Sequence, residues 1–370
     1  MPPAEADGGD AARPLVVRFG AIGDMILLTA LVRGLAAREG RPCDLVVTSG
    51  ASPKVLAGLD EVGDVFTLPS RRTPYWLAPP QRRLVRWLRR RGPSPTWVVE
   101  DLDKVHWLLD RGGVTEPWRV SAAELVRGDL EHAADHLHRM LAARPPAAPP
   151  PAGTAADPHP APRLALRPNE LADCDAWIAA RGWQGRPLVP LQTQSRRRFR
   201  GRWPDERWRG LAQAVLARLP EAVVVLIGAP AEEEALTALA AAAGDPRVEV
   251  AASDLPLRRL FALLARAHSC VSLDTGPAHA AAVLGCPLVV LVGSADPRRN
   301  HPVPVGSPLR LVVAWPEEAW PPTGDEWVAS HRPELVPLAP VVAAWEEVAA
   351  LGRGAGTGFA YRWVAGAEAG

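Results

Sequence analysis

The stretch that decides the fold is Val271-Ser272-Leu273-Asp274-Thr275-Gly276-Pro277-Ala278-His279, followed by the apolar run 280–284. Its first residues are short and apolar, as expected of a buried parallel strand. Thr275 is a capping residue type and proline suits a first helical position, so a helix is expected to begin here. The N–H groups at such a helix start can hold a phosphate. A capped turn that binds no ligand explains the same residues equally well.

Strands and helices alternate on both sides of this stretch. Such alternation is typical of parallel α/β sheets, in which ligands bind beyond the carboxyl ends of the strands. The sequence therefore predicts two Rossmann-like domains that face a central cleft. The expected strands are 15–19, 44–49, 65–68, 96–100, 187–192, 223–227, 248–251, 270–273 and 288–292, and the expected helices are 25–39, 81–91, 170–180, 204–218, 231–243, 256–267 and 341–351.

Composition sets the expected boundaries. A run rich in proline and alanine, RPPAAPPPAGTAADPHPAP, has almost no side chains that could build a core, which is typical of a linker. The predicted organisation is a disordered leader (1–13), a first Rossmann-like domain (14–143), the linker (144–165), a second Rossmann-like domain (166–340), a C-terminal helix (341–352) and a flexible tail (353–370).

Charge and cysteine content exclude several classes of protein. The formal net charge of the 370 residues is +1, so no basic excess exists to drive general nucleic-acid binding. The four cysteines are far apart in apolar segments, which predicts buried free thiols and a cytoplasmic protein. Residues 1–13 lack the basic start of a signal peptide, and no apolar run is long enough to cross a membrane.

A second candidate site lies near the N-terminus. Residues 20–24, Gly-Ala-Ile-Gly-Asp, follow the first expected strand as a loop, and their glycine spacing does not fit the dinucleotide fingerprint. Asp24 stands directly at a predicted helix start. The structural interpretation is an acid that interacts favourably with the helix dipole, and the functional one is a catalytic carboxylate.

Two further strand ends in the second half carry polar side chains. The first runs from Gln192 into an arginine-rich segment, RRRFRGR, whose guanidinium groups can hold a diphosphate, although a solvated charge run explains each arginine alone. The second, Gly228 to Glu234, can offer one carboxylate to ribose hydroxyls.

Taken in order, these motifs resemble glycosyltransferase family 9, the ADP-heptose:lipopolysaccharide heptosyltransferases and their relatives. The resemblance covers about residues 15–302, and its most specific part is D-T-G-P-A-H-x-A-A-x-L-G-x-P at 274–287. The other matches are R-x-x-x-x-G-D at 18–24, a serine followed by R-W-P at 195–204, G-x-P-x-E at 228–232 and V-x-L-V-G-S-A-D-P at 289–297.

The resemblance implies the GT-B fold, a nucleotide-sugar donor (ADP-heptose first) in the second domain and an acceptor in the first. It also implies an inverting transfer with no metal and no cofactor beyond the co-substrate. Asp24 falls on the family's proposed general base. The expected donor-binding residues are Thr193, Ser195, Arg200, Arg202, Gly228, Glu232, Asp274, Thr275, Gly276 and His279, and the expected acceptor-side residues are Gly20, Gly23, Arg83 and Arg86.

The expected acceptor is a glycan, glycolipid or small molecule, and the expected state is a monomer. The basic helix 81–91 suggests contact with an acidic acceptor or with the inner face of the cell membrane, whereas a solvated basic face is the plainer interpretation. Gly201 replaces the phosphate-binding lysine of the family, so Arg200 or Arg202 must supply that charge. Another nucleotide-sugar donor, a non-catalytic sugar-nucleotide-binding module and a Rossmann dehydrogenase remain the alternatives.

Overall fold

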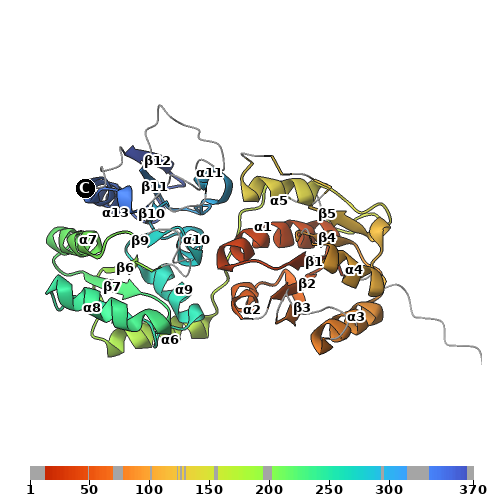
Figure 1. The fold of residues 1–370 in the computed structure, drawn as a ribbon, viewed down its shortest axis with the longest axis horizontal. Helices are drawn as coiled ribbons and strands as arrows, with labels where there is room; N and C mark the ends of the chain where they lie inside the picture. The colour runs from red at the N-terminus through yellow and green to blue at the C-terminus, as the bar shows by residue number, and fades with distance from the viewer. Residues whose placement is uncertain are drawn as a thin grey trace, which may run out of the picture. The chain divides into compact units, whose positions relative to one another are not determined.

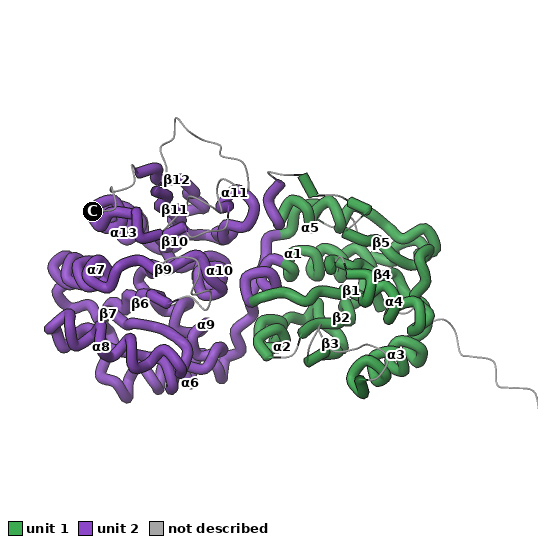
Figure 2. Tube along the Cα trace, in the orientation of Figure 1, with its two compact units in different colours: residues 1–21, 28–128, 134–160 green, residues 22–27, 129–133, 161–370 purple. Residues whose placement is uncertain are grey.

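The computed structural model describes residues 13–48, 50–69, 78–100, 102–122, 124–125, 127–128, 131–153, 157–194, 202–292, 296–314 and 333–364. The chain forms two compact α/β units, shown in Figures 1 and 2. Unit 1 comprises residues 1–21, 28–128 and 134–160, and unit 2 comprises residues 22–27, 129–133 and 161–370.

Unit 1 holds a five-stranded parallel sheet in the order β3-β2-β1-β4-β5. Because β1 runs on to β2 and β3 on one side and the chain returns to β4 and β5 on the other, the strand order reverses between β1 and β4. The strands are β1 (Leu15–Arg18), β2 (Cys43–Thr48), β3 (Val62–Leu68), β4 (Thr96–Val98) and β5 (Arg119–Ser121), and the helices are α1 (Ile22–Glu39), α2 (Ala51–Leu56), α3 (Pro79–Arg91), α4 (Asp103–Arg111) and α5 (Ala133–Ala142).

Unit 2 holds a seven-stranded parallel sheet in the order β12-β11-β10-β9-β6-β7-β8, which reverses between β6 and β9. The strands are β6 (Leu188–Gln192), β7 (Val223–Ile227), β8 (Val248–Ala251), β9 (Cys270–Leu273), β10 (Leu288–Leu291), β11 (Leu309–Ala314) and β12 (Phe359–Val364). The helices are α6 (Pro168–Ala180), α7 (Asp205–Arg218), α8 (Glu233–Ala243), α9 (Leu257–Arg266), α10 (Gly276–Val283), α11 (Pro297–Asn300) and α13 (Leu338–Leu351).

Both faces of the second sheet are buried, which explains why its strands are continuous apolar runs. Alternate residues of β7 enter two separate cores, Val224 and Leu226 into one and Val223 and Val225 into the other. Helices α7, α8 and α13 supply side chains to the first core, and α6 and α9 supply them to the second. The α/β class with two parallel sheets, expected from the sequence, is confirmed.

The predicted flexible tail is wrong for part of its length. Residues Phe359–Val364 form β12, which pairs in parallel with β11 along six residue pairs. Arg353 anchors the approach to this strand, because its guanidinium donates to the carbonyls of Leu264, Ala267 and Leu284. The alternation of aromatic residues at 359, 361 and 363 is a strand pattern that outweighs the surrounding glycines and alanines. Residues 365–370 lie outside the described residues.

The chain passes from unit 1 to unit 2 between Pro160 and Ala161, inside the predicted linker. The beginning of that segment contacts unit 1. Ala147 N–H donates to the Pro117 carbonyl at 2.8 Å, and Gly153 N–H donates to the Arg38 carbonyl at 2.9 Å. The predicted leader lies outside the described residues up to residue 12. In the part of the chain that the structure describes, no helix combines the length and the apolar character needed to cross a bilayer.

Candidate functional site

The strand-order reversal of unit 2 brings Gln192, at the end of β6, beside the end of β9. The buried Gln192 Oε1 accepts hydrogen bonds from Thr275 Oγ1 at 2.8 Å and Ser272 Oγ at 3.3 Å. Its Nε2 donates to the Gln194 carbonyl. These bonds join the loop after β6 to the loop after β9 at the position where ligands bind in open parallel sheets.

Thr275 occupies the N-cap position of α10 but does not cap the helix with its side chain. The expected capping hydroxyl is therefore wrong: Oγ1 instead donates to Gln192, with the Leu273 carbonyl as a second acceptor at 3.3 Å. The N–H groups of Ala278 and His279 donate back to the Thr275 carbonyl. Within the described residues, the N–H groups of Thr275 and Gly276 make no hydrogen bond, so they are the donors that this helix start can offer to an anion.

The first turn of α1 packs against the first turn of α10, and residues 22–27 accordingly belong to unit 2. A Cβ on Gly23 would lie 2.7 Å from His279 Cδ2, and a Cβ on Gly276 would lie 2.6 Å from Ile22 Cβ. Each helix start therefore needs a glycine where the other presents a side chain. This contact brings Asp24 close enough to His279 for its charge to act on the imidazole.

The structure extends α1 by three residues relative to the sequence-based expectation. The helix begins at Ile22, so Gly23 and the half-buried Asp24 lie in its first turn and not in a loop. Near a helix N-terminus a glycine costs less than in the interior, and an acid is favourable. Gly20 lies between β1 and this helix.

The His279 side chain is buried and neutral at physiological pH. Burial lowers its pKa to about 4, the negative charge of Asp24 acts in the opposite direction, and His301 lowers it further. The buried Nδ1 atom has no hydrogen-bond partner within the described residues. A neutral imidazole with an unused polar atom can accept or donate one hydrogen bond to a ligand, depending on its tautomer.

The remaining residues expected to bind the donor lie in different environments. Thr193 is buried and accepts a hydrogen bond from the Gln194 side-chain amide at 3.4 Å. Glu232 is half-buried, and its Oε2 accepts from Ala229 N–H at 2.7 Å and lies against Gly228, so this oxygen stabilises its own turn. Arg202 is exposed and pairs with Asp205 at 3.2 Å. Ser195 and Arg200 lie outside the described residues.

Comparison with known proteins places this site in a family. Residues 140–319, just under half of the chain, match the model of glycosyltransferase family 9 (heptosyltransferase). The matched region contains β6 to β11 and the whole Asp274 to His279 block, whereas Asp24 lies before it.

Solved structures extend the similarity in fold to nearly the whole chain. A family 9 glycosyltransferase from Veillonella parvula has a TM-score of 0.74 at 16% identity, over 94% of this chain and 99% of that one. The ADP-heptose lps heptosyltransferase II of E. coli has a TM-score of 0.65 at 20% identity, over 91% and 98%. E. coli heptosyltransferase WaaC with ADP has a TM-score of 0.58 at 23% identity, over 79% and 91%.

The solved structures confirm the GT-B fold. The match of residues 140–319 to the family model supports a glycosyltransferase. Among curated proteins, no sequence matches this chain.

The strand-order reversal of unit 1 has its own polar contacts, which the sequence-based analysis did not include. Phe19 N–H donates to the buried Glu100 carboxylate at 3.2 Å, and Arg18 Nη1 donates to the Val99 carbonyl at 3.0 Å. Glu100 thus ties the segment that leads into Asp24 to the end of β4. The sequence shows an acid at the end of the expected strand 96–100, but it does not indicate which residue this acid contacts.

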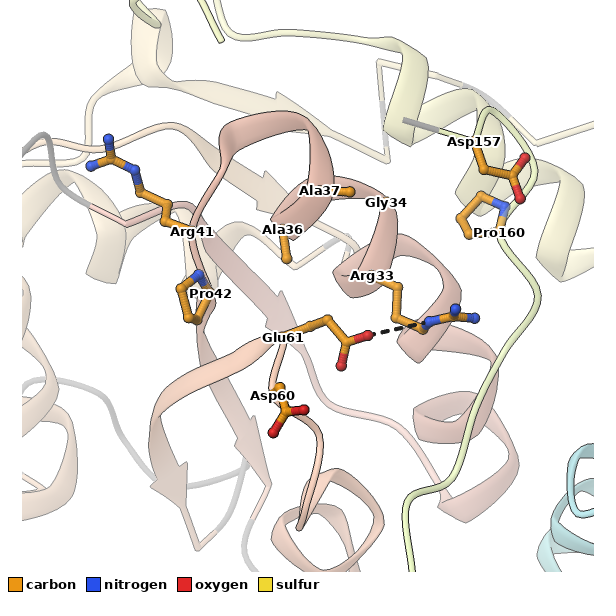
Figure 3. Close-up of a pocket in the computed structure, with 10 residues that line it drawn as sticks. All are labelled: Arg33, Gly34, Ala36, Ala37, Arg41, Pro42, Asp60, Glu61, Asp157 and Pro160. Carbon is orange, nitrogen blue, oxygen red and sulfur yellow. Dashed lines mark ion pairs between the residues drawn. The ribbon is translucent and has the colours of Figure 1, made fainter. Parts of the chain in front are cut away.

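Unit 1 also contains a cavity. A cavity of about 460 Å³ opens beside the C-terminal half of α1 and is lined by Arg33, Arg41, Asp60, Glu61 and Asp157 among others (Figure 3). Arg33 and Glu61 form an ion pair of 3.4 Å across its wall. None of the candidate site residues lines it. The described residues also contain no cluster of three or more His, Cys, Asp or Glu side chains able to hold a metal.

Proposed function

We propose that this glycosyltransferase transfers a sugar from a nucleoside diphosphate, with ADP-heptose as the first candidate, to an acceptor hydroxyl with inversion, and that Asp24 is the general base. The observation that carries the proposal is the contact between the two helix starts. Gly23 lies against His279 and Gly276 lies against Ile22, so a carboxylate stands next to the loop shared with family 9. An acid and an anion-binding turn in one cluster match the needs of sugar transfer.

The reaction follows from the groups present. The Asp24 carboxylate removes the proton of the acceptor hydroxyl, whose oxygen attacks the anomeric carbon from the face opposite the diphosphate. The bond from that carbon to the diphosphate oxygen breaks, and the leaving group takes the electron pair. We propose that the Thr275 and Gly276 N–H groups, which make no hydrogen bond within the described residues, bind this developing charge, because preorganised donors stabilise a leaving anion.

The donor assignment draws on the related structures. One similar protein is E. coli heptosyltransferase WaaC with ADP, and another structure of that enzyme contains ADP-2-deoxy-2-fluoro heptose. For the present chain we propose an adenine nucleotide on that basis. Other nucleotide sugars remain the alternative, because Gly201 replaces the lysine expected from the family resemblance.

Nucleotide binding tests the proposal directly. ADP or ADP-heptose should stabilise the protein by about 2.7 kcal/mol at one hundred times Kd, because ligands that bind only the folded state shift unfolding by mass action. Thermal unfolding with ADP, GDP, UDP and dTDP and their sugars ranks the bases. Asp274→Ala should abolish most of the shift, whereas the exposed Asp135→Ala serves as the control. A wild-type protein that responds to no nucleotide would refute the proposed function.

We also propose that helix α3 faces the anionic groups of the acceptor, at the inner surface of the cell membrane. Arg83, Arg86 and Arg90 are exposed, share one helical face at i, i+3 and i+7, and have no ion pair within the described residues. By contrast, Arg91 on the same helix pairs with Asp44 at 2.8 Å. A row of unpaired arginines complements a negative surface.

Charge reversal separates this proposal from a merely solvated face. Replacing Arg83, Arg86 and Arg90 by Glu should raise the acceptor KM and leave nucleotide binding unchanged, while the exposed α7 pair Arg209 and Arg218 provides control reversals. Sedimentation with vesicles containing phosphatidylglycerol distinguishes a lipid surface from a free acidic acceptor. An unchanged acceptor KM together with unchanged sedimentation would exclude a role for this helix in binding.

A further inference from the structure

We infer that Gln192 is a positioning residue for the proposed donor site: it fixes the Thr275 hydroxyl in a direction away from the ligand and leaves phosphate recognition to the backbone. The inference rests on the proposed function. Gln192 ends β6 and Thr275 follows β9, and these two strands flank the point where the strand order reverses. Their side chains meet at 2.8 Å, although 83 residues separate them in the chain.

The count of hydroxyl protons supports this assignment. A threonine hydroxyl has one proton to donate. For Thr275, the available acceptors are Gln192 Oε1 at 2.8 Å and the Leu273 carbonyl at 3.3 Å, and both belong to the protein interior. With its proton directed inward, the hydroxyl presents lone pairs outward, and a phosphate oxygen gains nothing from a second acceptor. The donors that remain at this turn are the N–H groups of Thr275 and Gly276.

The Gln192 amide is fixed at both ends. Oε1 also accepts from Ser272 Oγ at 3.3 Å, and Nε2 donates to the Gln194 carbonyl. The orientation of the amide follows from the Gln194 contact, since the reversed amide would place its oxygen against that carbonyl. Gln192 is only 6% exposed, and its bond with Ser272 is buried.

The same amide therefore controls two loops. Through Oε1 it sets the Thr275 side chain and hence the entry into α10, and through Nε2 it sets the backbone at Gln194, the last described residue before Arg202. Gln192 itself needs no contact with the nucleotide. Its removal should weaken nucleotide binding without altering the groups that carry out the chemistry.

The test uses Gln192→Met, which keeps the length of the side chain and removes the amide. Calorimetric titration with ADP should show a Kd raised about tenfold, which is the effect expected when the net contribution of one hydrogen bond is lost. The donor KM should rise in parallel, while kcat at saturating substrates changes by less than about twofold. Gln213→Met, the same substitution at an exposed position on α7, provides the matched control.

Thr275→Val removes the other partner of the hydrogen bond between Thr275 and Gln192. It provides an independent test if Gln192→Met folds poorly. Because both changes break one interaction, the double variant should bind ADP no more weakly than the weaker single variant. Additive losses, or a Gln192→Met protein that melts earlier yet binds ADP like the wild type, would overturn the inference. If instead the wild type binds none of the four nucleoside diphosphates, the proposed function fails, and this inference, which rests on it, is overturned as well.

Discussion

At each of the two strand-order reversals of the molecule, a strand leads into a helix whose N-terminal end favours a negative charge. At one, β1 leads into α1, whose first turn carries Asp24. At the other, β9 leads into α10, whose first turn carries no acid and begins with Gly276 and Pro277. Both helices have a positive N-terminal end. The side chains make the difference, because α1 carries a carboxylate in its first turn, whereas the N–H groups of Thr275 and Gly276 at the start of α10 make no hydrogen bond within the described residues.

The largest expected effect comes from removing the charge that distinguishes α1. Asp24→Asn keeps the shape of the side chain and removes its basicity, so kcat should fall by at least about 10²-fold, as is typical for the loss of a general base. ADP affinity and melting temperature should change little. Steady-state kinetics with the best donor, together with a melting curve, measure both quantities.

Normal turnover by Asp24→Asn with a lowered melting temperature would make this acid a helix-end residue. Helix-dipole stabilisation of that kind is worth only about 0.3–1 kcal/mol and is seen in folding. In that case Asp24 would contribute to the stability of the fold and not to catalysis.

The second effect concerns the neutral imidazole on α10. Burial lowers the pKa of His279 to about 4, below its unfolded value of about 6.5, so the unfolded state binds the proton first as pH falls. Wild-type stability should therefore drop by about 3 kcal/mol between pH 6.5 and pH 4, relative to His279→Gln. Urea unfolding at pH 7.5, 5.5 and 4.5 measures this difference. The exposed His159→Gln is the control, and an equal pH dependence in all three proteins would contradict the burial of this group.

The smallest effect tests the packing that joins the two helix starts. Gly276→Ala places a methyl group 2.6 Å from Ile22 Cβ, so overpacking should destabilise the fold by about 1–3 kcal/mol. Combining it with Ile22→Ala removes the opposing branch and should recover part of that loss. Chemical denaturation of the single and double variants gives the coupling. Strictly additive losses would show that these turns do not press on each other.

The sequence alone predicted both helix starts, because the residues that define each of them lie close together in the chain. The turn at 274–279 and the acid at Asp24 are recognisable from strand ends, glycines and helix starts a few residues apart. The strand alternation likewise predicted two parallel sheets. What it could not predict is strand order, since the pairing of β6 with β9 depends on contacts between segments about 80 residues apart.

The errors have the same origin. Gln192 and Glu100 were not assigned a role because their partners are remote in sequence: Thr275 for the first and the Phe19 backbone for the second. Thr275 fits a helix cap by residue type, but its hydroxyl accepts no hydrogen bond from the helix N–H groups and donates instead to Gln192 Oε1. For Glu232, the sequence did not indicate that Oε2 accepts a hydrogen bond from its own backbone at Ala229 N–H. When a side chain has several possible partners, distances in the folded structure determine which one it contacts, and a sequence motif does not give those distances.

The place of β12 also bears on how the protein is made. This strand lies at the edge of the unit 2 sheet. Arg310 Nη1 donates to the carbonyl of Gly358, directly before the strand, at 2.6 Å, and Arg362 within the strand donates to Glu347. The strand follows every other described strand in the chain, whereas every described strand of unit 1 precedes residue 122. Because domains fold as the chain emerges, unit 1 can fold on the ribosome long before the sheet of unit 2 is complete. Until residues 359–364 have been synthesised, β11 presents an unpaired edge, which exposes the nascent chain to aggregation.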